Sequence, residues 1–267
     1  TVNQSLQLQW LSKEKAPQII GWLFGAASVA TLFAYIGIIV GWKKLGLSFN
    51  FLYLSSGGLT ALIAIFCLFF FPNFRTETKP ITKLVIRRRY WLYYALELLS
   101  GARRQIFVVF AAFMMVEKFG FEVHQLTALF LINLVINIFA APLFGYFIAH
   151  FGERRALLIE YSGLVCVFLA YGGIYLFDWG VVIAAMLFIL DHLFFGLRIA
   201  LKTYFQKISS PEDIAPTAAV ALSINHIAAI FLPVLLGLLW LVSPAIVFLA
   251  AAFLAFLSFL LALLVPK

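Results

Sequence analysis

Two apolar stretches of this sequence, residues 90–116 and 180–205, contain ionisable side chains although each is long enough to cross a bilayer. These side chains are Glu97, Arg103 and Arg104 in the first stretch and Asp191, His192 and Arg198 in the second. An ionised group in hydrocarbon costs about 3 kcal/mol or more, so such residues are expected to be paired, to face water or to be functional. The six residues are therefore the candidates for binding a substrate or a coupling ion.

Their spacing indicates how the side chains are arranged around each helix. Glu97 and Arg104 are seven residues apart, and so are Asp191 and Arg198. At about 100° per residue, each pair is expected on one face of its helix, two turns apart. A rise of about 1.5 Å per residue places Arg103 and Arg104 roughly 20 Å from the start of their stretch, past the middle of the membrane.

Two interpretations of these charges remain open. In the structural one, Asp191 forms an ion pair with Arg103 or Arg104 and holds two helices together. In the functional one, Arg103 or Arg104 binds a carboxylate or phosphate through two parallel hydrogen bonds. Asp191 or Glu97 then takes up a coupling proton, because burial favours the neutral carboxyl, and His192 relays it.

The composition is that of a membrane protein with several spans. Of the 267 residues, 64% are hydrophobic and only 11% are charged, against about 25% charged in soluble domains. The net charge of +8 is assigned to loops that orient the chain in a membrane, and nucleic acid is not expected as a partner. The two cysteines, Cys67 and Cys166, lie in separate apolar runs and predict neither a disulfide nor a metal site. No cofactor is expected.

Eight segments are long and apolar enough to be membrane-spanning helices. They are residues 17–41, 49–72, 90–116, 124–149, 156–177, 180–205, 214–240 and 244–265. Continuous apolar runs of this length favour helices over the alternating segments of about ten residues that a membrane β-barrel requires. The expected fold is an all-α integral membrane protein.

The loops between these segments differ in charge. One side carries Lys13, Lys15, Arg75, Lys79, Lys83, Arg87, Arg88, Arg89, Arg154, Arg155, Lys207 and Lys267, and the other carries Lys43, Lys44 and Lys118. Because cytoplasmic loops carry the excess of lysine and arginine, both termini are expected in the cytoplasm.

The loop within residues 145–158 carries a motif. Gly145 can let two helices approach closely, Gly152 can form a tight turn, and Arg154 and Arg155 can contact helix ends and anionic headgroups. This pattern resembles the loop motif of the major facilitator superfamily. Two positions differ from that motif, since Ala149 stands at its acidic position and His150 at a position where arginine is usual. Glu160, one turn into the next helix beside the two arginines, is interpreted as structural.

The resemblance implies a division of the chain. Residues 1–72 resemble the last two helices of the family's N-terminal half, residues 73–89 its basic cytoplasmic linker, and residues 90–267 its six-helix C-terminal half. About four helices of the family's fold are then missing from this sequence. In that family the first and fourth helices of each half line a central cavity. In the C-terminal half of this chain, these two helices are the segments 90–116 and 180–205, which carry the intramembrane charges.

The resemblance also implies a function, which is secondary active transport of a small solute by alternating access, coupled to protons, in a bacterial inner membrane. Arg103 and Arg104 favour an anionic or zwitterionic solute. Membrane lipids and the solute are the expected partners. The alternative is a non-transporting structural or assembly subunit that binds other membrane subunits. An enzyme is not expected, because the sequence has no paired catalytic aspartates on facing helices, no H-E-x-x-H and no G-x-S-x-G.

Overall fold

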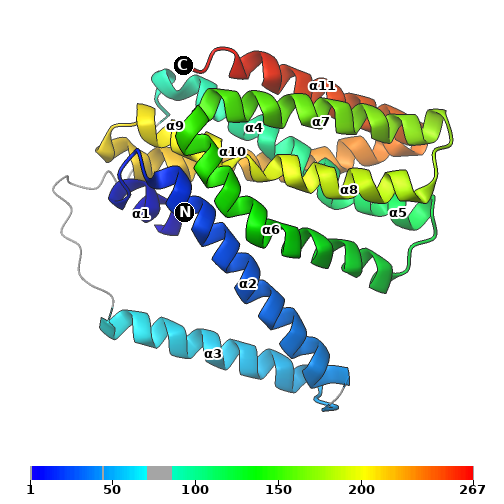
Figure 1. Cartoon of the computed structure of the whole chain (residues 1–267), viewed down its shortest axis with the longest axis horizontal. Coiled ribbons are helices and arrows are strands. Elements are labelled where there is room, and N and C mark those ends of the chain that lie inside the picture. The colour runs from blue at the N-terminus through cyan, green and yellow to red at the C-terminus, as the bar shows by residue number, and fades with distance from the viewer. Residues whose placement is uncertain (1, 44, 71–85, 267) are drawn as a thin grey trace.

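The computed structural model describes residues 2–43, 45–70 and 86–266, and this part of the chain is almost entirely helical. Its elements are α1 (Val2–Trp10), α2 (Ala16–Lys43), α3 (Phe49–Phe70), η1 (Arg88–Tyr90), α4 (Trp91–Gln105), η2 (Ile106–Ala111), α5 (Ala112–Glu117), α6 (Val123–Phe151), α7 (Glu153–Leu176), α8 (Val181–Gly196), α9 (Ile199–Ile208), α10 (Pro211–Val242) and α11 (Pro244–Ala262). Figure 1 shows them in chain order.

The described residues contain eight helical spans long and apolar enough to cross a membrane, which confirms the all-α membrane fold. Two of the spans are interrupted. A π-helical segment, η2, separates α4 from α5, and a tight turn separates α8 from α9. The short helix α1 was not predicted. The end of the second predicted segment, 71–72, and most of the predicted linker, 73–85, lie outside the described residues.

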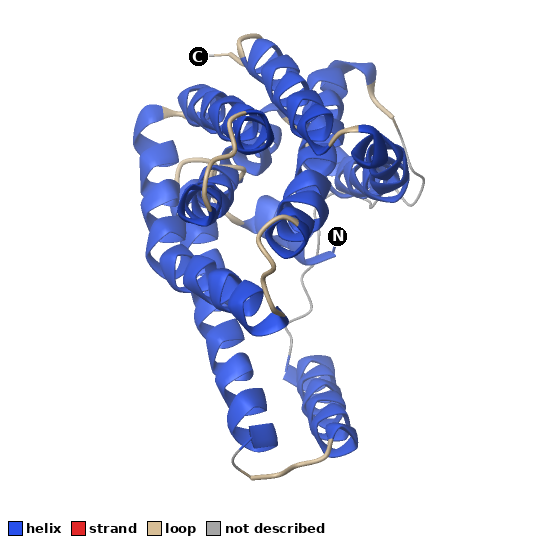
Figure 2. Cartoon of the chain, turned by 90° about the vertical axis from the view of Figure 1, so that its right-hand side faces the viewer, coloured by secondary structure: helices blue, strands red, loops and turns tan. Residues whose placement is uncertain are grey.

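Helices α4 to α11 form one bundle, seen nearly along the helices in Figure 2. Within it α7 packs on α11, α4 on α10, and α8 on both α6 and α7. The core is aromatic, with Tyr93 and Phe205 stacked at one end and Phe168, Phe188 and Phe248 fully buried towards the other.

One end of the bundle carries most of the basic residues. At this basic end α2, α4, α7 and α10 begin and α6, α9 and α11 end. Arg87 and Arg89, which the sequence analysis assigned to the linker, form ion pairs with the buried Asp213 at the start of α10, and Tyr90 also donates a hydrogen bond to it. These contacts attach the start of α4 to the start of α10.

Helix α2 crosses α6 at a close contact near the basic end. A Cβ added to Gly21 would lie 2.5 Å from the carbonyl oxygen of Ala141, and one added to Gly145 would collide with the carbonyl of Pro17. Further along the two helices, about two turns from Gly21 and from Gly145, Asn137 donates a hydrogen bond of 2.8 Å to Ser28. Beyond this contact α2 diverges from α6 (Figure 1). Gly145 thus lies where a side chain would have no space between the two helices.

Helix α3 stands apart from the bundle (Figure 1), and none of its residues is buried. Its surface is apolar, with Tyr53, Leu54 and Phe69 each more than 75% exposed.

Candidate functional site

A small polar cavity of about 90 Å³ lies among α4, α9 and α10. Its polar lining consists of Tyr93, Glu97, Arg104, Arg198, Lys202, Asn225 and His226. Three of the six predicted site residues, Glu97, Arg104 and Arg198, are in this set. The polar cavity is therefore lined by residues of both apolar stretches that carry ionisable side chains.

The α4 side of the cavity follows from helix periodicity. Glu97 and Arg104 share one face, as their spacing of seven predicts, and both line the cavity. Arg103 is rotated by about 100° from Arg104. It therefore points into the bundle, where it is only 1% exposed, whereas Arg104 is exposed.

The carboxylate of Glu97 is fixed from α10. Asn225 donates hydrogen bonds to both the backbone oxygen and Oε2 of Glu97, each 3.3 Å long. The helices meet closely here because α4 has Gly101 at the crossing, where a Cβ would lie 2.7 Å from the Asn225 carbonyl oxygen. The Tyr93 hydroxyl lies beside Glu97 but is buried without a hydrogen bond to any described residue.

The other side of the cavity begins at the turn between α8 and α9. The backbone N–H groups of Leu197 and Arg198 donate to the carbonyls of Phe194 and Phe195, three residues earlier, so the chain winds more tightly here than in an α-helix. This turn breaks the spacing prediction for the second pair. Asp191 is buried inside the bundle, with 2% of its surface exposed, whereas Arg198 lines the polar cavity. The two residues do not belong to one continuous α-helix, because α8 ends at Gly196.

Lys202, Asn225 and His226 were not among the predicted site residues. Lys202 follows Arg198 by four residues, and this i, i+4 spacing is the signal that could have found it. Its ammonium group also lies 4.6 Å from the centre of the Phe24 ring on α2. His226 Nδ1 donates a hydrogen bond to the carbonyl of Leu222 at 2.8 Å, so the other ring nitrogen, Nε2, does not take part in this bond.

Three further charged residues form a buried triad inside the bundle, namely Arg103, Glu160 and Asp191. Arg103 Nη2 lies 3.6 Å from Glu160 Oε1, and both side chains are 1% exposed. The guanidinium also stacks 4.3 Å from the centre of the Tyr161 ring. Asp191 is near enough to interact electrostatically with Arg103, but no ion pair within 4 Å joins it to Arg103 or Arg104 in the described structure.

The structural interpretation thus had the wrong ion-pair partner. Glu160, expected near Arg154 and Arg155, is instead the partner of Arg103. The reason is geometric: α7 packs with Glu160 facing the core, which the sequence spacing on α7 alone does not reveal. His192 packs its ring 5.8 Å from that of Phe107 and does not line the polar cavity.

The triad is unbalanced in charge and in hydrogen bonds. Two carboxyl groups accompany one guanidinium, and neither oxygen of Glu160 nor any guanidinium nitrogen of Arg103 makes a hydrogen bond with the rest of the described chain. Counted by itself, the triad would be neutral with one ionised carboxylate, one protonated carboxyl and the guanidinium, although Arg198 of the polar cavity also interacts electrostatically with Glu160.

The loop motif has the predicted turn. Gly152 has a φ of 86°, which favours glycine, and the turn joins α6 directly to α7. In the described part of the chain, the side chains of Arg154 and Arg155 form no hydrogen bond with a helix end. Next to them, Glu153 forms an ion pair with Lys207 at 2.7 Å. Among the described residues, no group of three His, Cys, Asp or Glu side chains could hold a metal ion.

The comparison with known families agrees with the helical architecture. Residues 1–221 match the model of the family described as Major Facilitator Superfamily. No curated protein matches the chain.

Proposed function

Because this chain belongs to the major facilitator superfamily, a family of membrane transporters, we propose that it takes part in secondary transport of a small anionic or zwitterionic solute. The solute would bind in the polar cavity, and its movement would be coupled to protons through alternating access. On this proposal the chain is a transporter and not an enzyme.

The observation that carries the proposal is the charge of the cavity. Three cations, Arg104, Arg198 and Lys202, line it together with one acid, Glu97. The two guanidinium groups can each hold a carboxylate or phosphate through paired hydrogen bonds, and Lys202 adds a point charge. Glu97, fixed by Asn225, could receive the ammonium group of a zwitterion.

Proton coupling is assigned to the buried triad. Its proton would sit on Glu160 or Asp191, with Arg103 stabilising whichever carboxylate is ionised. This assignment keeps the predicted proton role of Asp191, adds Glu160, and leaves Glu97 to the solute. The predicted relay by His192 stays a proposal, because this ring lies next to Asp191 in sequence and is partly buried.

Alternating access requires that one end of the protein be closed while the other is open. At the basic end, Gln206 donates hydrogen bonds to the carbonyls of Leu8 and Leu11, at 2.8 and 2.7 Å, and Lys13 donates to the carbonyl of Lys207 at 3.0 Å. At the opposite end, a groove of about 750 Å³ separates Ile39 on α2 from the start of α6. These contacts support a conformation closed at the basic end.

The solute class can be tested with the purified chain by measuring thermal unfolding against matched panels of carboxylates, phosphate esters, amino acids, sugars and organic cations. Anions or zwitterions are expected to raise the unfolding temperature, because a ligand that binds only the folded state stabilises it. The matched control is the Arg198→Ala variant, in which the same solutes should have much less effect. Stabilisation by sugars or cations alone would refute the proposed solute class.

Replacing Gln206 with leucine is expected to open the basic end. Two hydrogen bonds of about 1 kcal/mol each are lost, so the closed population should fall by roughly tenfold or more relative to the open one. A cysteine placed at the buried Ser5 of α1, in a background without Cys67 and Cys166, reports the change through its rate of maleimide labelling.

The matched control is Gln105→Leu, because Gln105 is partly buried and its side chain forms no hydrogen bond within the described part of the chain. Labelling at position 5 should rise in Gln206→Leu and stay unchanged in Gln105→Leu. Equal labelling of both variants would show that Gln206 does not hold this end closed.

A second function, as a structural subunit of a larger membrane complex, is favoured by one observation, the exposed apolar surface of α3. On that alternative, the chain would be purified with other membrane subunits and no anion would alter its stability. Stabilisation of the isolated chain by an anion would favour the transporter.

The orientation belongs to the same proposal. The excess of arginine and lysine at the basic end supports a cytoplasmic location for that end and for both termini. We propose a bacterial inner membrane as the location of the chain. The proposed division remains residues 1–72, the linker 73–89 and the six-helix half 90–267.

A further inference from the structure

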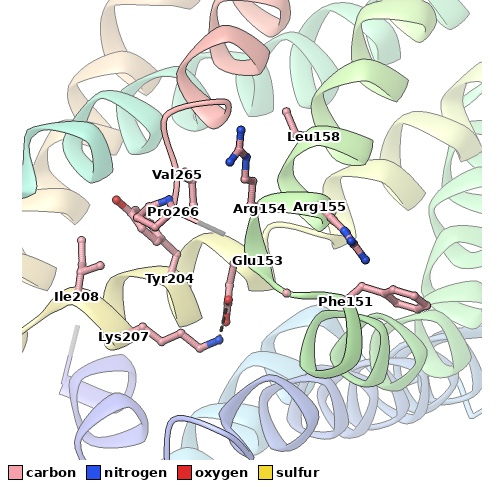
Figure 3. Close-up of a pocket in the computed structure, with 11 residues that line it drawn as sticks. Phe151, Glu153, Arg154, Arg155, Leu158, Tyr204, Lys207, Ile208, Val265 and Pro266 are labelled. Carbon is pink, nitrogen blue, oxygen red and sulfur yellow. Dashed lines mark hydrogen bonds and ion pairs between the residues drawn. The ribbon is translucent and has the colours of Figure 1, made fainter.

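A second pocket, separate from the polar cavity, opens at the basic end between α7, α9 and the C-terminal segment. It has a volume of about 630 Å³. Figure 3 shows its lining, in which Arg154 extends beside Val265 and Pro266 while Arg155 extends to the other side of α7, towards Phe151. Below them Lys207 of α9 contacts Glu153.

The charges of this pocket are not balanced within the protein. Glu153 is the acid in its lining, and its Oε2 is already bound by Lys207 at 2.7 Å. The guanidinium groups of Arg154 and Arg155 form no ion pair and no hydrogen bond with any residue in the described ranges. The lining therefore contains two guanidinium groups that have no anionic partner. The charges of Glu153 and Lys207 beside them neutralise each other.

The rest of the lining is apolar. Leu158, Ile208 and Val265 form walls beside the charges, and Tyr204 adds a ring that is 7% exposed. The pocket lies where α7 begins and where α9 and α11 end, which is the boundary between apolar spans and polar loops. A ligand here would place a charged group among the arginines and an apolar group against the walls.

We propose that this pocket binds the headgroup of an anionic phospholipid. Its phosphate would meet Arg154 or Arg155 through charge-assisted hydrogen bonds, and its glycerol and upper acyl chain would cover Leu158, Ile208 and Val265.

A phospholipid fits this pocket better than free phosphate does. Inorganic phosphate would use the arginines and leave the apolar walls uncovered, whereas a phospholipid uses both parts of the lining. The position at the membrane boundary also supplies a lipid at high local concentration. The inference does not depend on transport, since no residue of the polar cavity lines this pocket.

The test is lipid retention by the purified full chain, measured by native mass spectrometry after exchange into mixtures of phosphatidylglycerol and phosphatidylcholine. The unaltered chain should retain phosphatidylglycerol preferentially, and Arg154→Ala/Arg155→Ala should lose about 30-fold in relative affinity, at about 1 kcal/mol for each basic residue. The control, Lys15→Ala/Arg88→Ala, removes the same charge from exposed residues at the same end and should retain the lipid.

Three results would overturn the proposal. They are equal retention of both lipids, equal loss in the control variant, and displacement of the lipid by millimolar inorganic phosphate, which would make this a free-phosphate site. Arg154→Lys/Arg155→Lys guards against a folding defect, because it keeps the charges and should restore most of the retention.

Discussion

Replacing Arg104 or Arg198 with alanine is expected to lower uptake of the transported solute by about 100-fold in proteoliposomes. Each guanidinium lines the polar cavity, and truncating a charge that pairs with a bound ligand costs about 2–5 kcal/mol. Arg104 is exposed towards the cavity and has no ion-pair partner among the described residues. Its removal should therefore affect binding much more than folding.

The conservative variant distinguishes geometry from charge. Arg104→Lys keeps the positive charge but lacks the planar fork, so it is expected to recover only part of the lost uptake. The matched control is Arg88→Ala, which removes an exposed arginine at the basic end, outside the cavity. Unchanged uptake in Arg104→Ala and Arg198→Ala would leave the polar cavity without a role in transport.

Removing Arg103 is expected to have the largest effect on stability. In Arg103→Leu, Glu160 and Asp191 lose their guanidinium while they remain buried, and breaking a buried pair costs about 3–5 kcal/mol of unfolding free energy. By contrast, Glu160→Gln or Asp191→Asn alone should cost about 1 kcal/mol or less, because each leaves one carboxylate for one guanidinium. The measurement is the free energy of unfolding in mixed micelles.

The double variant Glu160→Gln/Asp191→Asn completes the comparison. It leaves Arg103 buried with no carboxylate, so it should be nearly as unstable as Arg103→Leu, and far more unstable than the sum of the two single changes. Glu14→Gln, at an exposed carboxyl outside the bundle core, is the control and should change stability by about 0.5 kcal/mol or less. If each single neutralisation costs as much as Arg103→Leu, both carboxyls are ionised and the triad holds no proton.

The buried triad is expected to affect both the free energy of unfolding and the coupling of solute transport to protons. If its proton drives transport, Glu160→Gln or Asp191→Asn should abolish solute accumulation driven by a pH gradient while exchange of solute across the membrane continues. A fully stable single variant that still accumulates solute would separate the triad from proton coupling and leave its role structural.

Most of the fold could be predicted from the sequence. Long uninterrupted apolar runs fix the number of spans, because a backbone in hydrocarbon must satisfy its hydrogen bonds within helices. The start of the last span also followed from a local residue, Pro244, which suits the first turn of a helix, whereas α10 begins at Pro211, three residues before the predicted start at 214. The motif around Gly145 and Gly152 indicated the family that the matched residues 1–221 then showed.

Part of the site could be predicted as well. The ionisable residues inside apolar runs stood out because of their cost in hydrocarbon, and the spacing of Glu97 and Arg104 correctly placed both on one face. The same reasoning failed for Asp191 and Arg198, because the tight turn at Leu197 changes the angle between residues before and after it.

The tertiary structure alone decided which charges meet. Periodicity gives the angle of a side chain around its own helix but not the helix that packs against that face. Thus adjacent Arg103 and Arg104 belong to different environments, Glu160 of α7 pairs with Arg103, and Asn225 of α10 holds Glu97. The sequence by itself determined the helices and which residues are costly in a membrane, whereas helix packing decided the partners that make those residues a cavity and a triad.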